Sequence, residues 1–256
     1  MAAVNQTARV GTDTWVRRFE PRPEADIRLF CLPHAGGSAP FFYPFSQQLP
    51  RGVEVLAVQY PGRQDRRGEP FAPDLHTLAD DIAESVQPWT DLPFALFGHS
   101  MGAVLAFEVA LRLEARGAEP RLLFASGHRA PSRPRSEAFD VDDDRQLIAD
   151  LRQAGTDPQL LGDPEVLATI LPVLRGDYRA SLSYRYREGQ RVRCPVVALA
   201  GTDDPHVDVD EAAAWARHTT ADFGMEVFRG DHFFVNAQRA AVLDVVGSRL
   251  GLGGAF

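Results

Sequence analysis

LFGHSMGAV, residues 96–104, places one serine between two glycines where an apolar run changes its period. The preceding residues, FALFGHS, indicate a short buried strand. The following residues, GAVLAFEVALRLEARG, repeat Val104, Phe107 and Leu111 at helical spacing until Gly117. In a G-x-S-x-G turn between strand and helix, the glycines leave room for a strained backbone that lifts the serine hydroxyl above the sheet edge. The pattern favours Ser100 as a nucleophile over the alternative, a serine that only caps the helix.

Six short apolar runs, rich in β-branched and aromatic residues, recur along the chain, and each has the length of a strand. They are IRLFCLP, VEVLAVQYP, PFALFGHS, RLLFASGH, CPVVALAGT and MEVFRG. Helical patterns alternate with them, as in DLHTLADDIAESV, which carries one apolar stripe. This alternation predicts an α/β fold, with a mostly parallel central sheet covered by helices on both faces. We expect the first 25 residues to be loosely ordered.

The length of 256 residues and a hydrophobic content of 45% predict a single domain over residues 1–256. The alternation stops over residues 133–190, where two helical patterns follow one another. This segment leaves from the carboxyl end of the run RLLFASGH, the edge at which α/β proteins bind their ligands. We therefore expect a helical lid insertion over Ser100. The alternative is an ordinary structural excursion.

The net charge of −8 argues against binding to nucleic acid or to an anionic membrane surface, both of which require excess positive charge. All 27 basic residues are arginine, which excludes catalysis by lysine. The sequence shows neither a secretory leader nor a membrane-spanning run, so we expect a cytoplasmic protein. Cys31 and Cys194 lie in or beside strand-like runs without metal-ligand spacing, which predicts buried free thiols and no metal site.

A serine hydroxyl becomes an effective nucleophile when a histidine takes its proton and a carboxylate orients that histidine. His232 follows the last predicted strand and precedes the final helix, which fits the chain order serine, acid, histidine. The loop GTDDPHVD, after the run CPVVALA, offers two acids, of which we favour Asp204 over Asp203. Asp231 is a weaker candidate, because neighbours in an extended loop point apart.

The remaining histidines are weaker candidates for the base. His99 adjoins the nucleophile and should point elsewhere from the turn. The others lie in helical patterns or at the ends of predicted strands, namely His76, His218, His34, His128 and His206.

Two backbone N–H groups are needed to stabilise a tetrahedral oxyanion. Met101 supplies the first, because it follows the nucleophile. The loop LPHAGGSAPFF follows the first predicted strand, and Gly36 and Gly37 let its backbone turn sharply. We therefore expect the amide of Ala35 to be the second donor.

The motifs PHAGGSA, YPGR, GHSMG, GTDDP and GDHFF together resemble those of type II thioesterases that serve polyketide and nonribosomal peptide synthetases, over about residues 27 to 250. The resemblance implies an α/β-hydrolase fold and a hydrolase that releases acyl or aminoacyl groups from the phosphopantetheine arm of acyl or peptidyl carrier proteins. It also implies Ser100 as nucleophile, His232 as base, Asp204 as orienting acid, and an oxyanion hole formed by Ala35 and Met101. The phosphopantetheine belongs to the substrate protein, so we expect no cofactor of the enzyme itself, and we expect a monomer.

Two arginine clusters follow predicted strand ends at the same edge and could form a positive rim for an acidic carrier protein. They are Arg63, Arg66 and Arg67, and Arg129, Arg133 and Arg135. The alternative is solvated arginine on loops. Two rival functions also stay open, an esterase or acyltransferase of the same fold and a noncatalytic module that binds acyl ligands or proteins.

Overall fold

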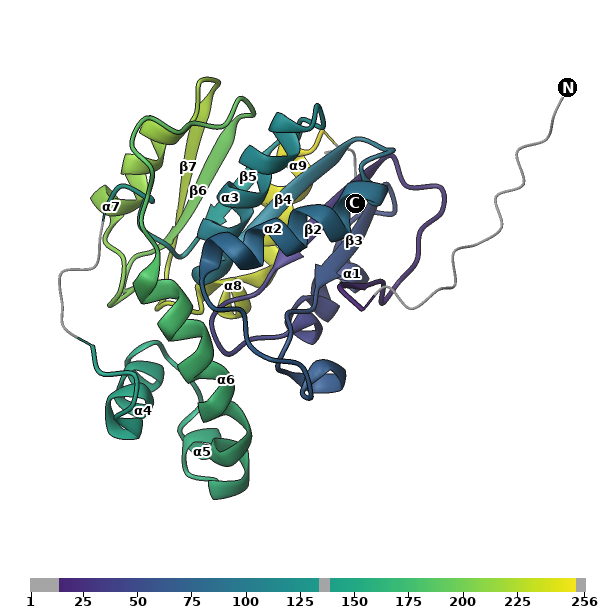
Figure 1. Ribbon diagram of the computed structural model, residues 1–256. Coiled ribbons are helices and arrows are strands. Elements are labelled where there is room, and N and C mark those ends of the chain that lie inside the picture. Colours follow the sequence, from purple (N-terminus) through teal and green to yellow (C-terminus); the bar gives the residue numbers. More distant parts are fainter. Residues whose placement is uncertain (1–13, 134–138, 252–256) are drawn as a thin grey trace, which may run out of the picture.

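The structure is a computed structural model that describes residues 14–133 and 139–251. Its centre is a seven-stranded sheet with the strand order β1-β3-β2-β4-β5-β6-β7 (Figure 1). All neighbouring strands are parallel except β1 and β3. The predicted mostly parallel α/β fold is therefore confirmed. The strands are β1 (Val16–Arg17), β2 (Ile27–Leu32), β3 (Val53–Val58), β4 (Phe94–His99), β5 (Leu123–Ser126), β6 (Val196–Gly201) and β7 (Phe223–Phe228).

The edge strand β1 was not predicted. It pairs antiparallel with β3, so that Val16 lies opposite Val58 and Arg17 opposite Ala57. The expectation of loose order is therefore wrong for this segment, whereas residues 1–13 lie outside the described residues. Two residues are too few to show a period in sequence, and their pairing depends on a partner strand far along the chain.

Helices cover both faces of the sheet, as the alternating pattern predicts (Figure 1). One buried cluster packs α2 (Leu75–Val86) and α3 (Met101–Ala115) against the sheet. A second cluster, on the other face, includes residues of α1 and α9 together with Phe234 at the start of α8. The bounds of these three helices are Tyr43–Gln48 for α1, Phe234–Ala237 for α8 and Arg239–Arg249 for α9.

Between β5 and β6 the described residues form three helices, which Figure 1 shows grouped at one end of the sheet. They are α4 (Asp144–Gln153), α5 (Pro158–Leu161) and α6 (Pro164–Ser183). An aspartate begins each of them, and its carboxylate accepts a hydrogen bond from an amide of the first turn, as an N-cap requires. These N-caps are Asp143, Asp157 and Asp163.

The remaining helical elements are short and connect the larger ones. They are α7 (Val209–Ala213), η1 (Ala39–Phe42), η2 (Gln64–Arg66), η3 (Gln87–Trp89) and η4 (Ala214–His218).

Candidate active site

Ser100 occupies the strained turn between β4 and α3. Its backbone has φ 55° and ψ −124°, a left-handed conformation that is rare for serine. Glycine is required on both sides: a Cβ atom on Gly98 would lie 2.0 Å from the carbonyl oxygen of Gly102, and one on Gly102 would lie 2.1 Å from that of Leu32. Within the described residues, the Ser100 side chain makes no capping hydrogen bond to α3. The geometry thus matches a strained strand-to-helix nucleophile turn and not a helix cap.

Asp204 and His232 meet at the carboxyl edge of the sheet. Asp204 follows β6 and His232 follows β7, and Nδ1 of His232 lies 2.8 Å from Oδ2 of Asp204. Both side chains are buried, with exposed fractions of 7% for His232 and 0% for Asp204. Because an ionised carboxylate only accepts hydrogen bonds, Nδ1 carries the hydrogen, and Nε2 is left to accept a proton. The pair therefore has the arrangement that a general base and its orienting acid require.

The second oxygen of Asp204 is also occupied, because Oδ1 accepts a hydrogen bond of 2.9 Å from the backbone N–H of His206. The alternative acid, Asp203, instead accepts a hydrogen bond of 2.8 Å from the hydroxyl of Thr202. The structure thus joins His232 to Asp204, the acid that the sequence favoured.

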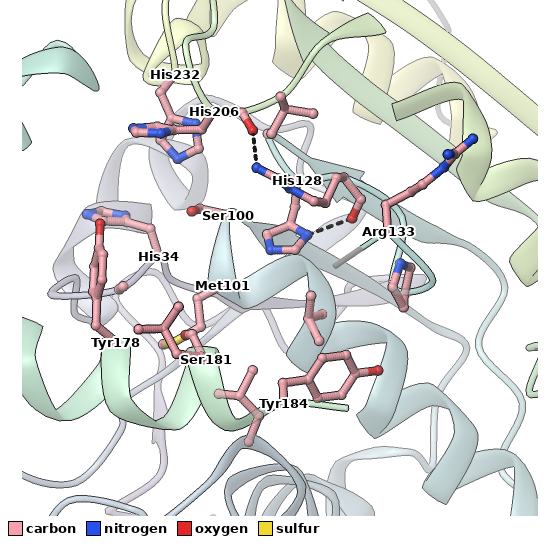
Figure 2. Close-up of a pocket in the computed structure, with 18 of the residues that line it drawn as sticks. His34, Ser100, Met101, His128, Arg133, Tyr178, Ser181, Tyr184, His206 and His232 are labelled. Carbon is pink, nitrogen blue, oxygen red and sulfur yellow. Dashed lines mark hydrogen bonds between the residues drawn. The ribbon is translucent and has the colours of Figure 1, made fainter. Parts of the chain in front are cut away.

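Ser100 and His232 line the same cavity, whose volume is about 690 Å³. Figure 2 shows Ser100 beneath the rings of His232 and His206. Ala35 and Met101 line this cavity as well. Met101 is the first residue of α3, and the first amides of a helix have no partner within it. The structure therefore brings together at one cavity the nucleophile, the base and both expected amide donors.

The loop that carries Ala35 is a tight turn. The amide of Gly37 donates to the carbonyl oxygen of His34 at 2.9 Å, and Gly36 has φ 75° at the third position. A positive φ at this position is the reason that the turn needs glycine. Of the turn residues, His34 and Ala35 line the cavity.

Three further histidines surround the base, a feature that sequence reasoning missed. The ring of His206 lies 5.0 Å from that of His232 and the ring of His99 lies 5.2 Å from it, while His34 lies 6.1 Å from His99. Burial and, to a smaller extent, the neighbouring His232 lower the pKa of His34 to about 3 and that of His99 well below its ordinary value. His34 and His99 therefore stay neutral near neutral pH, so they do not oppose a positive charge on His232.

His99 is fixed away from the nucleophile, as expected. Its Nδ1 lies 3.0 Å from the hydroxyl of Ser126, at the end of β5, and both side chains are buried. This pair is separate from the Asp204–His232 pair.

Arg63 and Arg66 are not part of the expected exposed positive rim, because each is buried and only 5% exposed. Arg63 forms a two-bond ion pair with Asp177 of α6. Arg66 pairs with Glu69 at 2.5 Å and stacks over the ring of Trp15 at 4.0 Å. Both side chains turn inward because these partners compensate their charges, and the partner of Arg63 lies 114 residues away in the sequence.

The other arginines of the two clusters differ in accessibility. Arg67 and Arg133 are exposed, and Arg133 lines the cavity. Arg129 is partly buried, because it donates to the carbonyl oxygen of His206 at 2.6 Å and lies 3.4 Å from Glu211. Arg135 lies outside the described residues.

Both cysteines are buried free thiols, and burial raises the pKa of Cys31 and raises that of Cys194 to about 12. Across residues 14–133 and 139–251, no group of three or more His, Cys, Asp and Glu side chains is placed to hold a metal ion. In the same ranges, no helix is both long and apolar enough to cross a bilayer.

The family comparison agrees with the geometry. The profile of the thioesterase domain family matches residues 27–250. The chain is 46% identical over 232 residues to the thioesterase PikA5 of Streptomyces venezuelae, covering 90% of this chain and 83% of that protein. It is 49% identical over 229 residues to a probable cadicidin biosynthesis thioesterase of Streptomyces griseus, covering 89% of this chain but only 63% of the length of that relative.

One solved structure with a similar fold is that of the type II thioesterase BorB from the borrelidin biosynthetic cluster. It is 44% identical to this chain, with a TM-score of 0.86, and the match covers 94% of this chain and 99% of that one. The fold and the cavity at the carboxyl edge define an α/β-hydrolase. The chain belongs to the thioesterase family, and the resemblance to type II thioesterases is confirmed.

Proposed function

We propose that the chain is a type II thioesterase that hydrolyses acyl or aminoacyl groups from the phosphopantetheine arm of carrier proteins. It would thereby clear stalled polyketide or nonribosomal peptide synthetases. The single observation that supports this most strongly is the buried hydrogen bond of 2.8 Å between His232 and Asp204, at the cavity that Ser100 also lines. The names of its relatives, a thioesterase and a type II thioesterase of biosynthetic clusters, support the substrate class.

In the acylation step, the Ser100 hydroxyl oxygen attacks the thioester carbonyl carbon while Nε2 of His232 takes the hydroxyl proton. The carbonyl oxygen becomes an oxyanion that accepts hydrogen bonds from the amides of Ala35 and Met101. The C–S bond then breaks, and the thiol leaves with the proton from His232. The product of this step is an acyl ester of Ser100.

In the deacylation step, a water molecule gives a proton to His232 and attacks the ester carbonyl through the same oxyanion site. The C–O bond breaks, Ser100 recovers its proton from His232, and the free acid leaves. Throughout the cycle, Asp204 holds the ring in one tautomer and stabilises the imidazolium. A thiol is a good leaving group, so positioning and the oxyanion site account for much of the rate gain.

The insertion forms part of the cavity wall, which supports the proposal that it acts as a lid. Residues of α4 and α6 that line the cavity include Leu151, Tyr178, Ser181 and Leu182. A cavity of about 690 Å³ falls within the range of small-molecule sites, which is roughly 300–1,000 Å³. We therefore assign the insertion the role of enclosing the acyl chain and limiting the access of water.

A carrier protein must approach this cavity with its arm extended. Among the described arginines of the two clusters, Arg67 and Arg133 are exposed, and Arg133 lines the cavity. An acidic carrier protein would be attracted to these charges in spite of the net charge of −8. The proposed enzyme acts as a cytoplasmic monomer, and its two free thiols are consistent with a reducing compartment.

The proposal is tested with one acylated carrier protein as substrate. The variant Ser100→Ala should lose hydrolysis almost completely, and retention of most of the turnover would exclude the proposed mechanism. A noncatalytic module would release no acid even as the wild type. An esterase or acyltransferase of the same fold would be recognised by transfer of the acyl group to an added alcohol or amine in preference to water.

A further inference from the structure

The buried ion pair between Arg63 and Asp177 has no part in the chemistry just described, yet it lies directly behind the oxyanion loop. We propose that these two side chains are positioning residues that hold the turn carrying Ala35, so that the second oxyanion donor is aligned only when helix α6 is docked. The inference rests on the proposed function, because it assigns a role to the Ala35 amide.

Arg63 and Asp177 form two hydrogen bonds with each other, and each also forms a hydrogen bond with the backbone of the loop. Both Nη atoms of Arg63 lie 2.7 Å from the two carboxylate oxygens of Asp177, and each side chain is 5% exposed. Oδ2 of Asp177 also accepts the backbone N–H of Gly36 at 2.7 Å. On the other side, Nη1 of Arg63 donates to the carbonyl oxygen of Gly37 at 3.0 Å. The pair therefore forms hydrogen bonds with two successive residues of the turn, Gly36 and Gly37.

The neighbours of Arg63 in the sequence hold the rest of the loop. The hydroxyl of Tyr60 donates to the carbonyl oxygen of Pro33 at 3.1 Å, and Oε1 of Gln59 accepts the amide of Ala39 at 2.9 Å. Nε2 of Gln59 in turn donates to the carbonyl oxygen of Arg63 at 3.3 Å. The segment QYPGR, residues 59–63, thus supports the loop PHAGGSA, residues 33–39, along its length.

These bonds fix the two peptide units that meet at Ala35. A peptide unit is planar, so holding one of its polar groups restrains the orientation of the other. The unit that contains the Ala35 N–H also contains the His34 carbonyl, which accepts from Gly37 at 2.9 Å. The next unit contains the Gly36 N–H, which donates to Asp177. Two adjacent glycines would otherwise leave this turn free to change its conformation.

Stability alone does not explain why charged side chains occupy this position. A buried ion pair is often no more stabilising than a well-packed apolar pair of similar volume. An apolar pair, however, can neither accept the amide of Gly36 nor donate to the carbonyl of Gly37. The hydrogen bonds to the turn are therefore a property that the Arg63–Asp177 pair provides and an apolar pair cannot.

Helix α6 brings Asp177 to the turn from the insertion, 141 residues further along the chain than Gly36. The helix lies directly on the turn, because a Cβ atom on Gly36 would be 3.0 Å from Cδ1 of Leu174. The same helix lines the acyl cavity through Tyr178 and Ser181. Docking of α6 onto the turn therefore also aligns the Ala35 amide.

The decisive variant is the double substitution Arg63→Met with Asp177→Leu, which removes both charges together. The matched control is Glu54→Gln, which breaks another buried ion-pair cluster, with Arg18 and Arg28, on strand β3. For each protein we would measure the unfolding temperature, kcat and KM on a small acyl thioester, and the inhibition constant of a boronic acid. The boronic acid forms a tetrahedral adduct on Ser100 whose oxygen occupies the oxyanion site.

We expect the double variant to show kcat lowered about 10- to 100-fold, less than the roughly 10²–10³-fold cost of losing a donor outright. KM should change little, and the boronic acid should bind more weakly by a similar factor. The control should change only the unfolding temperature. Wild-type kcat and wild-type boronic acid affinity in the double variant would overturn the proposal.

If the double variant does not fold, Asp177→Asn decides the question. Carboxylate oxygens of Asp177 accept from Gly36 and from both Nη atoms of Arg63. Asparagine offers one uncharged acceptor in place of two charged ones, and its NH2 group cannot accept from Arg63. The hydrogen bonds that hold the turn should therefore weaken, so kcat and boronic acid affinity should fall together by several-fold. Unchanged values of both would reject the positioning role. A failure of the proposed function itself would be distinct, because the Ser100→Ala protein would then keep its turnover.

Discussion

Nδ1 of His232 and Oδ2 of Asp204 lie 2.8 Å apart, although 28 residues separate them in the sequence. The topology explains this contact. The two residues follow β7 and β6, which are neighbouring parallel strands, so their loops leave the sheet side by side at the same edge. Burial of both side chains removes competing water from the hydrogen bond.

The role of Asp204 predicts the effect of Asp204→Asn. An amide at this position no longer stabilises the imidazolium and favours the wrong tautomer, so kcat should fall between about 10²- and 10⁴-fold. The control is Asp203→Asn, which alters the neighbouring acid that contacts Thr202 and should leave kcat within a few-fold of wild type. Steady-state hydrolysis of an acyl thioester measures both. Equal losses in the two variants would contradict the assignment of the acid.

The packing at the nucleophile turn predicts that Gly102→Ala is severely destabilising. The added Cβ atom would lie 2.1 Å from the carbonyl oxygen of Leu32, so backbone must move. We expect the free energy of unfolding to fall by more than about 3 kcal/mol, as for other substitutions that force backbone apart. Urea unfolding gives this value, provided that the variant is soluble.

The matched control is Gly247→Ala in helix α9, where the new Cβ atom would meet Pro50 at an ordinary distance of 3.7 Å. Alanine is the better helix former by about 1 kcal/mol, so this protein should be as stable as wild type or more so. A Gly102→Ala protein with the stability of this control would show that the turn is not as tight as the structure implies.

The parts of the site that follow from local sequence were predictable. Ser100, Met101 and the flanking glycines belong to one turn, whose chemistry is encoded within a few residues. His232 and Asp204 were found because strand order places the loops after successive parallel strands at one edge. The cluster of His34, His99 and His206 around the base could not be found in this way, because ring contacts depend on how loops fold back over the sheet.

The exposure of the arginine side chains could not be predicted from the sequence. Arg63 and Arg66 follow a strand end and carry charge, which is also the pattern of an exposed rim. Whether such a side chain points outward depends on its partner, and for Arg63 that partner is Asp177, in the distant insertion. Strand β1 was missed for a similar reason, because it forms by pairing with the distant β3 and its own two residues carry no strand pattern.

We expect the buried His218 to make the stability of the folded protein sensitive to acid. It is 1% exposed, and burial, together with Arg191 and Arg217, lowers its pKa from 6.5 to about 4. Between these pH values the unfolded chain binds the proton and the folded protein does not. The free energy of unfolding should therefore fall as the pH falls from 6.5 to 4, by up to about 1.4 kcal/mol per pH unit from this group.

The measurement is the free energy of unfolding at several pH values for the wild type and for His218→Gln. The substitution removes the titrating group, so the variant should show a shallower slope below pH 6.5. Parallel slopes in the two proteins would mean that His218 is protonated in the folded state.

The exposed arginines predict a docking effect that is selective for the carrier protein. Reversing the charge of Arg67 and Arg133 together should raise KM for an acylated carrier protein about 10-fold and leave KM for a small acyl thioester unchanged. The control is Arg121→Glu, an exposed arginine at the amino end of β5, on the opposite edge of the sheet. Equal effects on both substrates, or an equal effect of the control, would argue against docking at this rim.

The central claim is that the acyl group passes through Ser100, and rapid quenching followed by mass spectrometry tests it most directly. The protein is mixed with an acyl thioester, quenched with acid within the first turnover and digested. We predict that the acyl mass appears on the peptide that contains Ser100, and that its amount falls as the free acid accumulates. Continued release of acid with no acyl group on that peptide, or with the group on another residue, would contradict the account.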